Sequence, residues 1–293
     1  MCLLALASAA GGQQLEPRAY EPAPVGLNTL GVAYTDSSGS VTLDPAIPLR
    51  NVNARIHAAA SYYGRTFGVF GRQASALVTV PYAWGRVEGD VLIPPVGHKV
   101  VEPSGLADPA LRLAMNIIGS PALDLAGFRA RPRTTVLGAS LAVVAPLGQY
   151  NPQVLINLGQ NRWAFKPELG LSQPFGNWRL EAYAGGWFYT DNDDYFGGHI
   201  RRQDPLLSIQ SHVVYDFAGL GWAAADFTYF GGGATELSGK RNADRQDNTR
   251  TGVTLALPLG KQALLKGIYA HGTSARVGSD LDTYGASLQI LWF

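Results

Sequence analysis

The chain has 293 residues, of which 15% are charged and 35 are glycine, and its formal net charge is +1. Soluble domains usually carry about 25% charged residues, and nucleic-acid binding needs a basic surface that this charge balance does not supply. The mean hydropathy is close to zero, and past residue 10 no run approaches the roughly 18 apolar residues of a spanning helix. These values predict a membrane β-barrel, in which only every second residue needs to be apolar.

The first ten residues, MCLLALASAA, resemble the apolar core and small-residue end of a secretory signal. We therefore interpret residues 1–10 as a signal-peptide remnant. Residues 11–26 are rich in Pro and Gln and are predicted to form an N-terminal periplasmic segment or to fold into the lumen as a partial plug. Residues 27–293 are predicted to form the barrel. Cys2 is the only cysteine, so no intramolecular disulfide is expected.

From Leu27 onward, segments of about ten to fifteen residues alternate between apolar and polar side chains, which is the signature of a strand with one apolar face. Between residues 207 and 217, for example, apolar side chains occupy most odd positions and polar side chains most even ones. The expected strands are 27–36, 52–64, 73–87, 109–118, 135–146, 162–172, 178–190, 206–217, 221–231, 249–259, 262–272 and 282–293. The fold class is therefore all-β: a membrane-spanning antiparallel up-and-down β-barrel of about twelve strands.

The connections between these strands alternate in length. Residues 173–177, 218–220 and 260–261 form short links, whereas 191–205 and 232–248 form long polar ones. Short periplasmic turns and longer outer loops produce this alternation. The link 119–134 is the exception, because it is long where a short turn is expected.

Alternation alone does not show which strand face contacts water, because the strands of a soluble β-barrel or sandwich alternate in the same way. Aromatic residues near strand ends favour the membrane, since outer-membrane barrels carry an aromatic girdle at each interface. The girdle expected at one rim comprises Tyr34, Tyr82, Trp84, Trp163, Phe188, Tyr229 and Tyr284, and that at the other Tyr62, Trp178, Phe217 and Trp292. The apolar faces are then expected to contact outer-membrane lipid.

The opposite faces would line the lumen, because a Lys or Arg facing lipid near the bilayer midplane costs roughly 2–4 kcal/mol. The predicted lumen-lining residues, which are candidates for a substrate path, are Arg55, His57, Arg112, Arg162, Lys166, Glu168, Arg179, Glu181, His212, Asp216, Asp226 and Lys266. Twelve tilted strands enclose a backbone radius of roughly 12 Å. Side chains from both walls would leave a channel about one small molecule wide.

Several short motifs resemble those of outer-membrane transporters associated with the meta-cleavage pathway of phenol degradation. They are Ser104-Gly105-Leu106-Ala107-Asp108-Pro109, Pro146-Leu147-Gly148-Gln149-Tyr150, Asn157-Leu158-Gly159-Gln160-Asn161-Arg162-Trp163 and Phe188-Tyr189-Thr190-Asp191-Asn192. The resemblance covers most of the chain after about Leu27. It implies a barrel that moves aromatic or other apolar small molecules, and it supplies no catalytic residues.

The sequence therefore predicts an outer-membrane channel of a Gram-negative bacterium for passive uptake of small apolar or aromatic compounds. A structural barrel without transport and a soluble β-rich periplasmic binding protein are the alternatives. Ser208, His212 and Asp216 share one face, but residues four apart on a strand lie about 13 Å apart, too far for a nucleophile and its base. The sequence thus predicts no enzyme.

Asp191, Asp193 and Asp194 lie near Gly197, Gly198 and His199, but they lack EF-hand spacing, so a solvated loop is favoured over a calcium site. The chain contains no phosphate-cradling GxxxxGK[ST] motif. We expect no metal, no cofactor and no nucleic-acid partner.

Overall fold

The computed structural model describes residues 16–42, 49–92 and 96–293. The predicted signal remnant at 1–10 lies outside these residues and stays a prediction. Twelve long strands form the body of the molecule. They are β1 (Asn28–Thr42), β2 (Leu49–Val69), β3 (Arg72–Val91), β6 (Ala110–Ile118), β7 (Val136–Val144), β8 (Ala164–Phe175), β9 (Trp178–Tyr189), β12 (Leu206–Asp216), β13 (Trp222–Gly232), β16 (Gln246–Leu259), β17 (Ala263–Ala275) and β18 (Gly278–Trp292).

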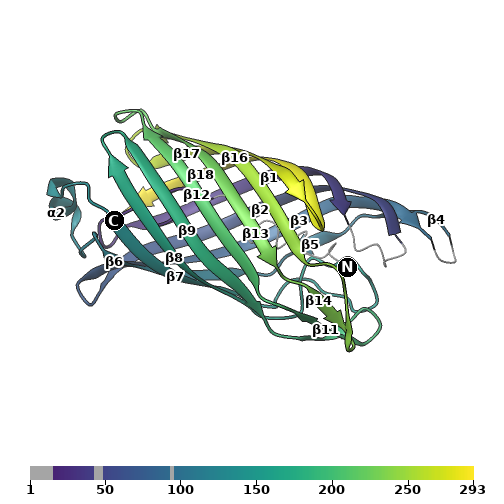
Figure 1. The fold of residues 1–293 in the computed structure, drawn as a ribbon. Coiled ribbons are helices and arrows are strands. Elements are labelled where there is room, and N and C mark those ends of the chain that lie inside the picture. The colour runs from purple at the N-terminus through teal and green to yellow at the C-terminus, as the bar shows by residue number, and fades with distance from the viewer. Residues whose placement is uncertain (1–15, 43–48, 93–95) are drawn as a thin grey trace.

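Each of these strands pairs antiparallel with its neighbours along the chain, and the last pairs with the first. The closing ladder joins β1 to β18 from Asn28 opposite Trp292 to Thr42 opposite Gly278 without a register shift. Closure leaves no strand edge in the wall, so its backbone N–H and C=O groups can pair with neighbouring strands on both sides. Figure 1 shows the resulting tilted barrel. The predicted fold class and strand number are confirmed.

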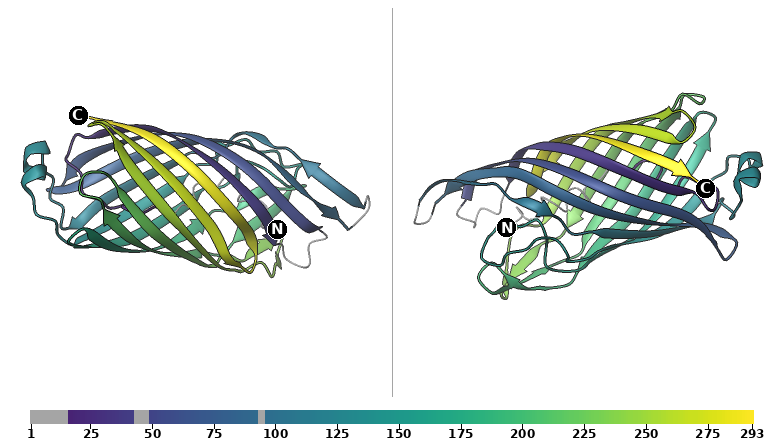
Figure 2. Two further views of the ribbon diagram at one scale, coloured as in Figure 1. Left: turned by 90° about the horizontal axis from the view of Figure 1, so that it is seen from above. Right: turned by 180° about the vertical axis from the view of Figure 1, so that it is seen from behind.

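The two ends of the barrel differ. Tight turns join β2 to β3, β8 to β9 and β16 to β17, and Gly71, Gly176 and Gly260 occupy positive φ values of +73°, +59° and +73° in them. This turn end, which also carries the C-terminus, is the periplasmic end on the usual outer-membrane pattern. The long link after β6 contains α2 (Leu125–Ala130), whose Asp124 cap accepts a hydrogen bond from the Gly127 N–H at 2.8 Å. In Figure 2, α2 projects from this end. No helix in the described ranges is long and apolar enough to cross a membrane.

Longer connections cover the opposite end. They contribute β4 (Gly97–Val101) and β5 (Ser104–Leu106), which pair with β3. They also form a small separate sheet from β10 (Asn192–Tyr195), β11 (His199–Gln203), β14 (Thr235–Leu237) and β15 (Lys240–Arg241). In Figure 1, β11 and β14 lie at this end of the barrel, whereas β4 projects beyond it beside the end of β3.

The outer face of the wall is apolar. Val253 on β16 is 54% exposed, and Leu180 on β9 and Ile209 on β12 are also largely exposed, whereas their sequence neighbours Thr254, Glu181 and Gln210 are buried on the inner side. Exposed apolar side chains on one face of every strand are what contact with acyl chains requires. Trp84, Trp163 and Tyr284 lie exposed toward the loop end, and Trp178 and Trp292 toward the turn end.

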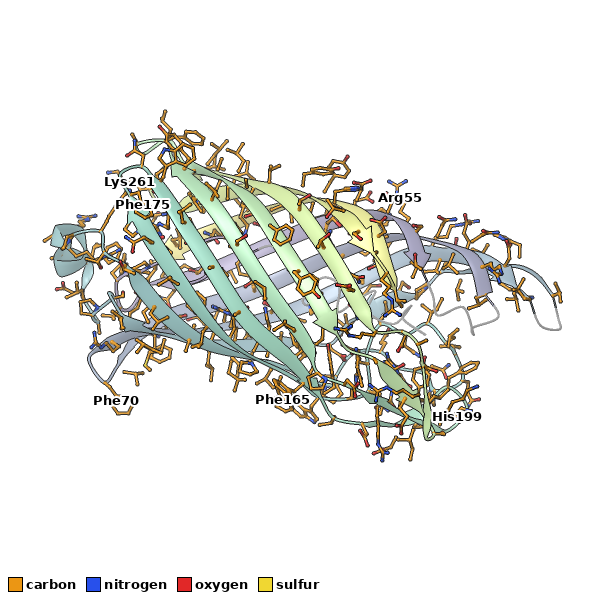
Figure 3. All side chains as sticks on the ribbon, viewed as in Figure 1. Arg55, Phe70, Phe165, Phe175, His199 and Lys261 are labelled. Atoms are coloured by element: carbon orange, nitrogen blue, oxygen red, sulfur yellow. The ribbon has the colours of Figure 1, made fainter. Side chains whose placement is uncertain are left out.

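Strand β2 departs from the prediction. Its Arg55 side chain is 65% exposed, and Figure 3 shows it outside the barrel wall. His57 shares that outer face, where its ring stacks on Trp84 at 5.5 Å. Tyr62 faces the interior and donates a hydrogen bond to Gln289 at 3.4 Å. The predictions that placed Arg55 and His57 in the lumen and Tyr62 in a girdle are therefore wrong.

The length of β1, β2 and β3 gives the physical reason. They run for 15, 21 and 20 residues, whereas a membrane-spanning strand needs about 9–11. Their upper parts project beyond the hydrocarbon layer, where Arg55 can pair with Asp36 at 2.9 Å in water. The interior of this projection is a small apolar core, as in a soluble protein: Val41, Val52, Ala54, Ile56, Val87 and Leu281.

A charge placed on the lipid face tests the membrane assignment. We expect Val253→Arg to lower the free energy of unfolding in lipid vesicles by about 2–4 kcal/mol, because the guanidinium would enter the hydrocarbon layer. Leu220→Arg, in the exposed turn between β12 and β13, should cost about 0–1 kcal/mol as the control. Guanidinium titration followed by tryptophan fluorescence measures both. Equal values for the two variants would contradict the assignment.

Candidate functional site

The lumen is the candidate site, and ten of the predicted residues lie on its side of the wall. Seven of them come from four neighbouring strands, which we call the charged wall: Lys166 and Glu168 on β8, Arg179 and Glu181 on β9, His212 and Asp216 on β12, and Asp226 on β13. Arg112 on β6 and Lys266 on β17 line the lumen elsewhere. Arg162 precedes β8 and is buried under the outer loops.

Ion pairs and hydrogen bonds connect the charged wall. Lys166 pairs with Glu168 at 2.6 Å. His212 Nδ1 lies 2.6 Å from Asp226 Oδ1, and the Thr254 hydroxyl donates to the other oxygen of Asp226 at 2.8 Å. These pairs satisfy charges that would be costly to bury singly.

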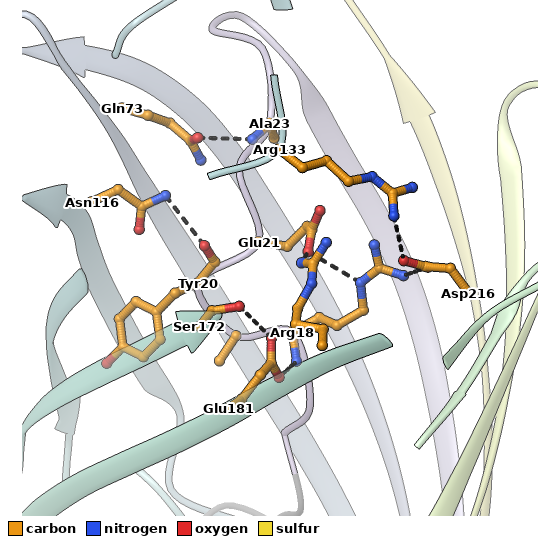
Figure 4. A network of polar contacts seen from close by, with 12 residues as sticks. Arg18, Tyr20, Glu21, Ala23, Gln73, Asn116, Arg133, Ser172, Glu181 and Asp216 are labelled. Carbon is orange, nitrogen blue, oxygen red and sulfur yellow. Dashed lines mark hydrogen bonds and ion pairs between the residues drawn. The ribbon is translucent and has the colours of Figure 1, made fainter. Parts of the chain in front are cut away.

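An inserted segment, residues 16–26, crosses the lumen next to this wall (Figure 4). The Arg18 backbone N–H donates to Glu181 at 2.7 Å, and its guanidinium binds Asp216 at 2.8 Å. Glu21 pairs with Arg179, and the Ala23 N–H donates to the Gln73 side chain of β3 at 2.8 Å. Contacts to β3, β9 and β12 hold the segment across the turn-end half of the barrel.

Tyr20 is a large, fully buried side chain of the inserted segment and is 2% exposed. Its hydroxyl lies 2.9 Å from Ser140 Oγ and donates to Glu168 at 3.1 Å. A Cβ on Gly138 or Gly170 would come within 2.1 Å of the Tyr20 ring. These two strand glycines are therefore needed where the ring lies flat against the wall. Glycine inside a strand often marks such a close approach, a signal that our sequence analysis did not use.

The wall on the other side of the lumen carries small apolar side chains among hydroxyl-bearing ones such as Thr35, Thr79 and Ser287. We call it the apolar wall: Ala33 on β1, Ile56, Ala58 and Ala60 on β2, Leu77 on β3, Ile268 and Ala270 on β17, and Leu281 on β18. A cavity of about 410 Å³ lies between it and the inserted segment, from which Glu16, Pro17 and Ala19 reach the cavity surface. The sequence pattern alone does not reveal this wall, because it places the apolar face of β2 against lipid.

The motifs that carry the family resemblance meet in one layer at the outer mouth. Asp108 accepts hydrogen bonds from the backbone N–H groups of Gly148 at 2.9 Å and Gln160 at 2.8 Å. Burial raises the pKa of the Asp108 carboxyl above its usual value, although these two hydrogen bonds oppose the shift. Asn192 donates to the Gln160 carbonyl at 2.9 Å. The motifs thus fix the fold of the loops.

Two groups weighed in the sequence analysis have other contacts. The carboxylate beside His212 belongs to Asp226, while Asp216 binds Arg18 and Arg133. Asp191 pairs with Arg202 at 2.9 Å. No cluster of three or more potential metal-ligating side chains occurs in the part of the chain that the structure describes.

A closed antiparallel wall with an apolar exterior and a charged interior defines an outer-membrane β-barrel. The sequence profile of one family, described as "Putative MetA-pathway of phenol degradation", matches residues 34–288. The chain belongs to this family, which confirms the resemblance stated above.

Solved structures share the fold at low identity. An outer-membrane channel from Pseudomonas putida F1 is 20% identical, with a TM-score of 0.78 over 95% of this chain and 100% of that one. The β domain of the Bordetella autotransporter BrkA is 13% identical, with a TM-score of 0.51 over 91% and 100%. The transport unit of the Escherichia coli autotransporter AIDA-I is 8% identical, with a TM-score of 0.51 over 98% and 95%. No curated protein matches the sequence significantly.

Replacing Asp108 tests whether it holds the loop layer together. Asp108→Ala removes two hydrogen bonds to a carboxylate, each worth about 1.5–3 kcal/mol, so we expect faster proteolytic cleavage within residues 145–163. Asp193→Ala, at an exposed position of the same loop layer, should leave the cleavage rate unchanged. Limited proteolysis with mass spectrometry gives both rates. Unchanged cleavage of Asp108→Ala would show that other contacts fix the layer.

Proposed function

We propose that the protein is a channel for passive uptake of small apolar or aromatic compounds across the outer membrane. The cavity of about 410 Å³ between the apolar wall and the inserted segment is the observation that carries the proposal. Its volume falls in the range of small-molecule sites, about 300–1,000 Å³. A path lined by Ala58, Ala60 and Leu77 on one side would let an apolar solute cross without losing all its apolar contacts.

The comparisons support this proposal. The Pseudomonas putida protein that shares the fold is described as an outer-membrane channel, and the family description refers to phenol degradation. The family's link to a catabolic pathway fits a protein that admits the pathway's small aromatic substrates. Of the ten inward-facing predicted residues, Arg112 and Lys266 line this cavity and would flank the solute path, while the inserted segment lies between the path and the charged wall.

The inserted segment is proposed to act as a partial plug. Arg18, Tyr20 and Glu21 tie it to β7, β8, β9 and β12, so its position sets the free cross-section of the lumen. The same contacts favour the second candidate, a structural barrel that does not conduct. Planar-bilayer recordings of the full chain separate the two, because a structural barrel would give no single-channel steps.

Variants that weaken the contacts of the inserted segment test the plug directly. We expect the double variant Arg18→Ala, Tyr20→Ala to show a larger single-channel conductance than the wild type, because the segment loses its ion pair with Asp216 and its packing on Gly170. Arg133→Ala is the control, since Arg133 binds the same Asp216 at 3.2 Å from the link that contains α2. Its conductance should match the wild type. An unchanged conductance in the double variant would rule out the plug.

Solute uptake tests the substrate class. Liposomes containing the protein should take up phenol faster than protein-free liposomes, and the protein-dependent gain should be larger for phenol than for a sugar of similar size. Filling the path by Ala60→Phe should reduce the gain for phenol. If the sugar enters as fast as phenol through the wild-type protein, the lumen is a general pore and the proposed substrate class is wrong.

A further inference from the structure

Lys266 is a cationic side chain without a counter-ion of its own. It lies on the inner face of β17 and lines the cavity. Within residues 16–42, 49–92 and 96–293, its ammonium group makes no ion pair or hydrogen bond. The charges of Glu16 and Asp226 act on it from beyond ion-pair distance, and both Asp226 oxygens are already bound by His212 and Thr254. A partly buried ammonium in this position is stabilised by any anion that reaches it.

Other cations reach the same cavity. Arg112 extends from β6, with its guanidinium 4.9 Å from the centre of the Tyr20 ring and one nitrogen donating to the Ala19 carbonyl at 3.4 Å. Its second terminal nitrogen, Nη2, is buried and has no acceptor among the described residues. Arg250 also lines the cavity and donates to Thr283. Glu16 is the only carboxylate of the described cavity lining, so the cavity has an excess of positive charge.

The apolar wall adjoins these cations, because Ile268 and Ala270 follow Lys266 on the same inner face of β17. Its side chains at Ala33, Ala60 and Ile268 offer contact to a flat hydrocarbon body but no hydrogen bond. A ligand that contacts both therefore needs one anionic group and one compact apolar body. A neutral phenol fits the apolar wall but leaves Lys266 without a counter-charge, whereas a hydrogen bond to an ionised acceptor is roughly twice as strong as one to a neutral group.

We propose that this cavity binds small organic anions with an apolar body, of which aromatic carboxylates are the best-matched class. The carboxylate accepts hydrogen bonds from Lys266, and the ring packs on the apolar wall at Ala60 and Ile268. This site rests on the proposed function and specifies which solutes bind transiently inside the channel.

Equilibrium binding by calorimetry, with the full chain in detergent, tests the proposal on the wild type. Benzoate combines the two features, benzamide has the same shape without the charge, and acetate has the charge without the ring. We expect benzoate to bind at least about tenfold more tightly than benzamide, because one charge-assisted hydrogen bond is worth about 1.5–3 kcal/mol. It should also bind at least about tenfold more tightly than acetate, because acetate buries no aromatic ring. Equal binding of benzoate and benzamide, or no benzoate binding, would overturn the proposal.

Variants then locate the site. Lys266→Gln should weaken benzoate binding about tenfold or more and leave benzamide unchanged, whereas Lys266→Arg should retain benzoate. Lys261→Gln removes the same charge from the exposed turn before β17, and Figure 3 shows this residue at the turn end. It should bind benzoate as the wild type does. Unchanged benzoate affinity in Lys266→Gln would show that the anion binds elsewhere, and it would contradict the assignment of Lys266 as the residue that binds the carboxylate.

Heat-modifiable gel mobility shows whether each variant is folded. If Lys266→Gln does not fold, Ala60→Phe takes its place: by filling the cavity it should abolish benzoate binding, and retained binding would overturn the proposal. The results also distinguish failure of this binding site from failure of the proposed channel function. Phenol uptake by a wild type that does not bind benzoate would leave the channel intact and remove only this site. Benzoate binding without uptake or conductance would keep the site and remove the channel.

Discussion

The hydrocarbon layer cannot hydrogen-bond to a peptide group, and the wall of this protein is organised by that constraint. The ladder between β1 and β18 pairs the first strand with the last over its whole length, so that no strand edge remains in contact with lipid. Closure also fixes two faces on every strand. One face is apolar because acyl chains surround it, and the other is free to carry any chemistry that the lumen requires.

Charged and apolar side chains are unevenly distributed around the lumen. Charged side chains gather on β8, β9, β12 and β13, while the cavity lining on β1, β2, β3, β17 and β18 combines small apolar side chains with hydroxyl-bearing ones and with Lys266. The inserted segment lies against the charged wall because its own Arg18 and Glu21 find partners there in Asp216 and Arg179. The space left over is therefore bounded by the apolar wall on one side. An interior with this polarity differs from a uniformly polar pore, and the proposed solutes with an apolar body and an anionic group follow from it.

The outer loops and the inserted segment narrow the lumen from opposite ends. Asp108 ties the loops after β5 and β7 together at the mouth, and Tyr20 packs against β7 and β8 nearer the turn end. Each depends on glycines whose missing side chains make room for a close approach, Gly148 and Gly159 at the mouth and Gly138 and Gly170 in the wall. The recognisable motifs of the sequence lie in the loop layer rather than along the lumen, so they identify the family without naming its solute.

Local patterns in the sequence predict the number of strands, their approximate bounds and the order of short and long links. Alternation with period two and turn residues such as Gly71 and Gly260 are local signals, and a local signal survives without tertiary context. These patterns also predict the inward side of β8, β9, β12 and β13, because charged residues alternate there with apolar ones at membrane depth. The tertiary structure decided the orientation of β2. Arg55 and His57 face water outside the barrel because β2 outruns the bilayer, a length that depends on its pairing with β1 and β3. The inserted segment and the cavity were also decided there, because Tyr20 meets Gly138 and Gly170 across more than a hundred residues of chain. No periodicity within one segment encodes a contact of that range.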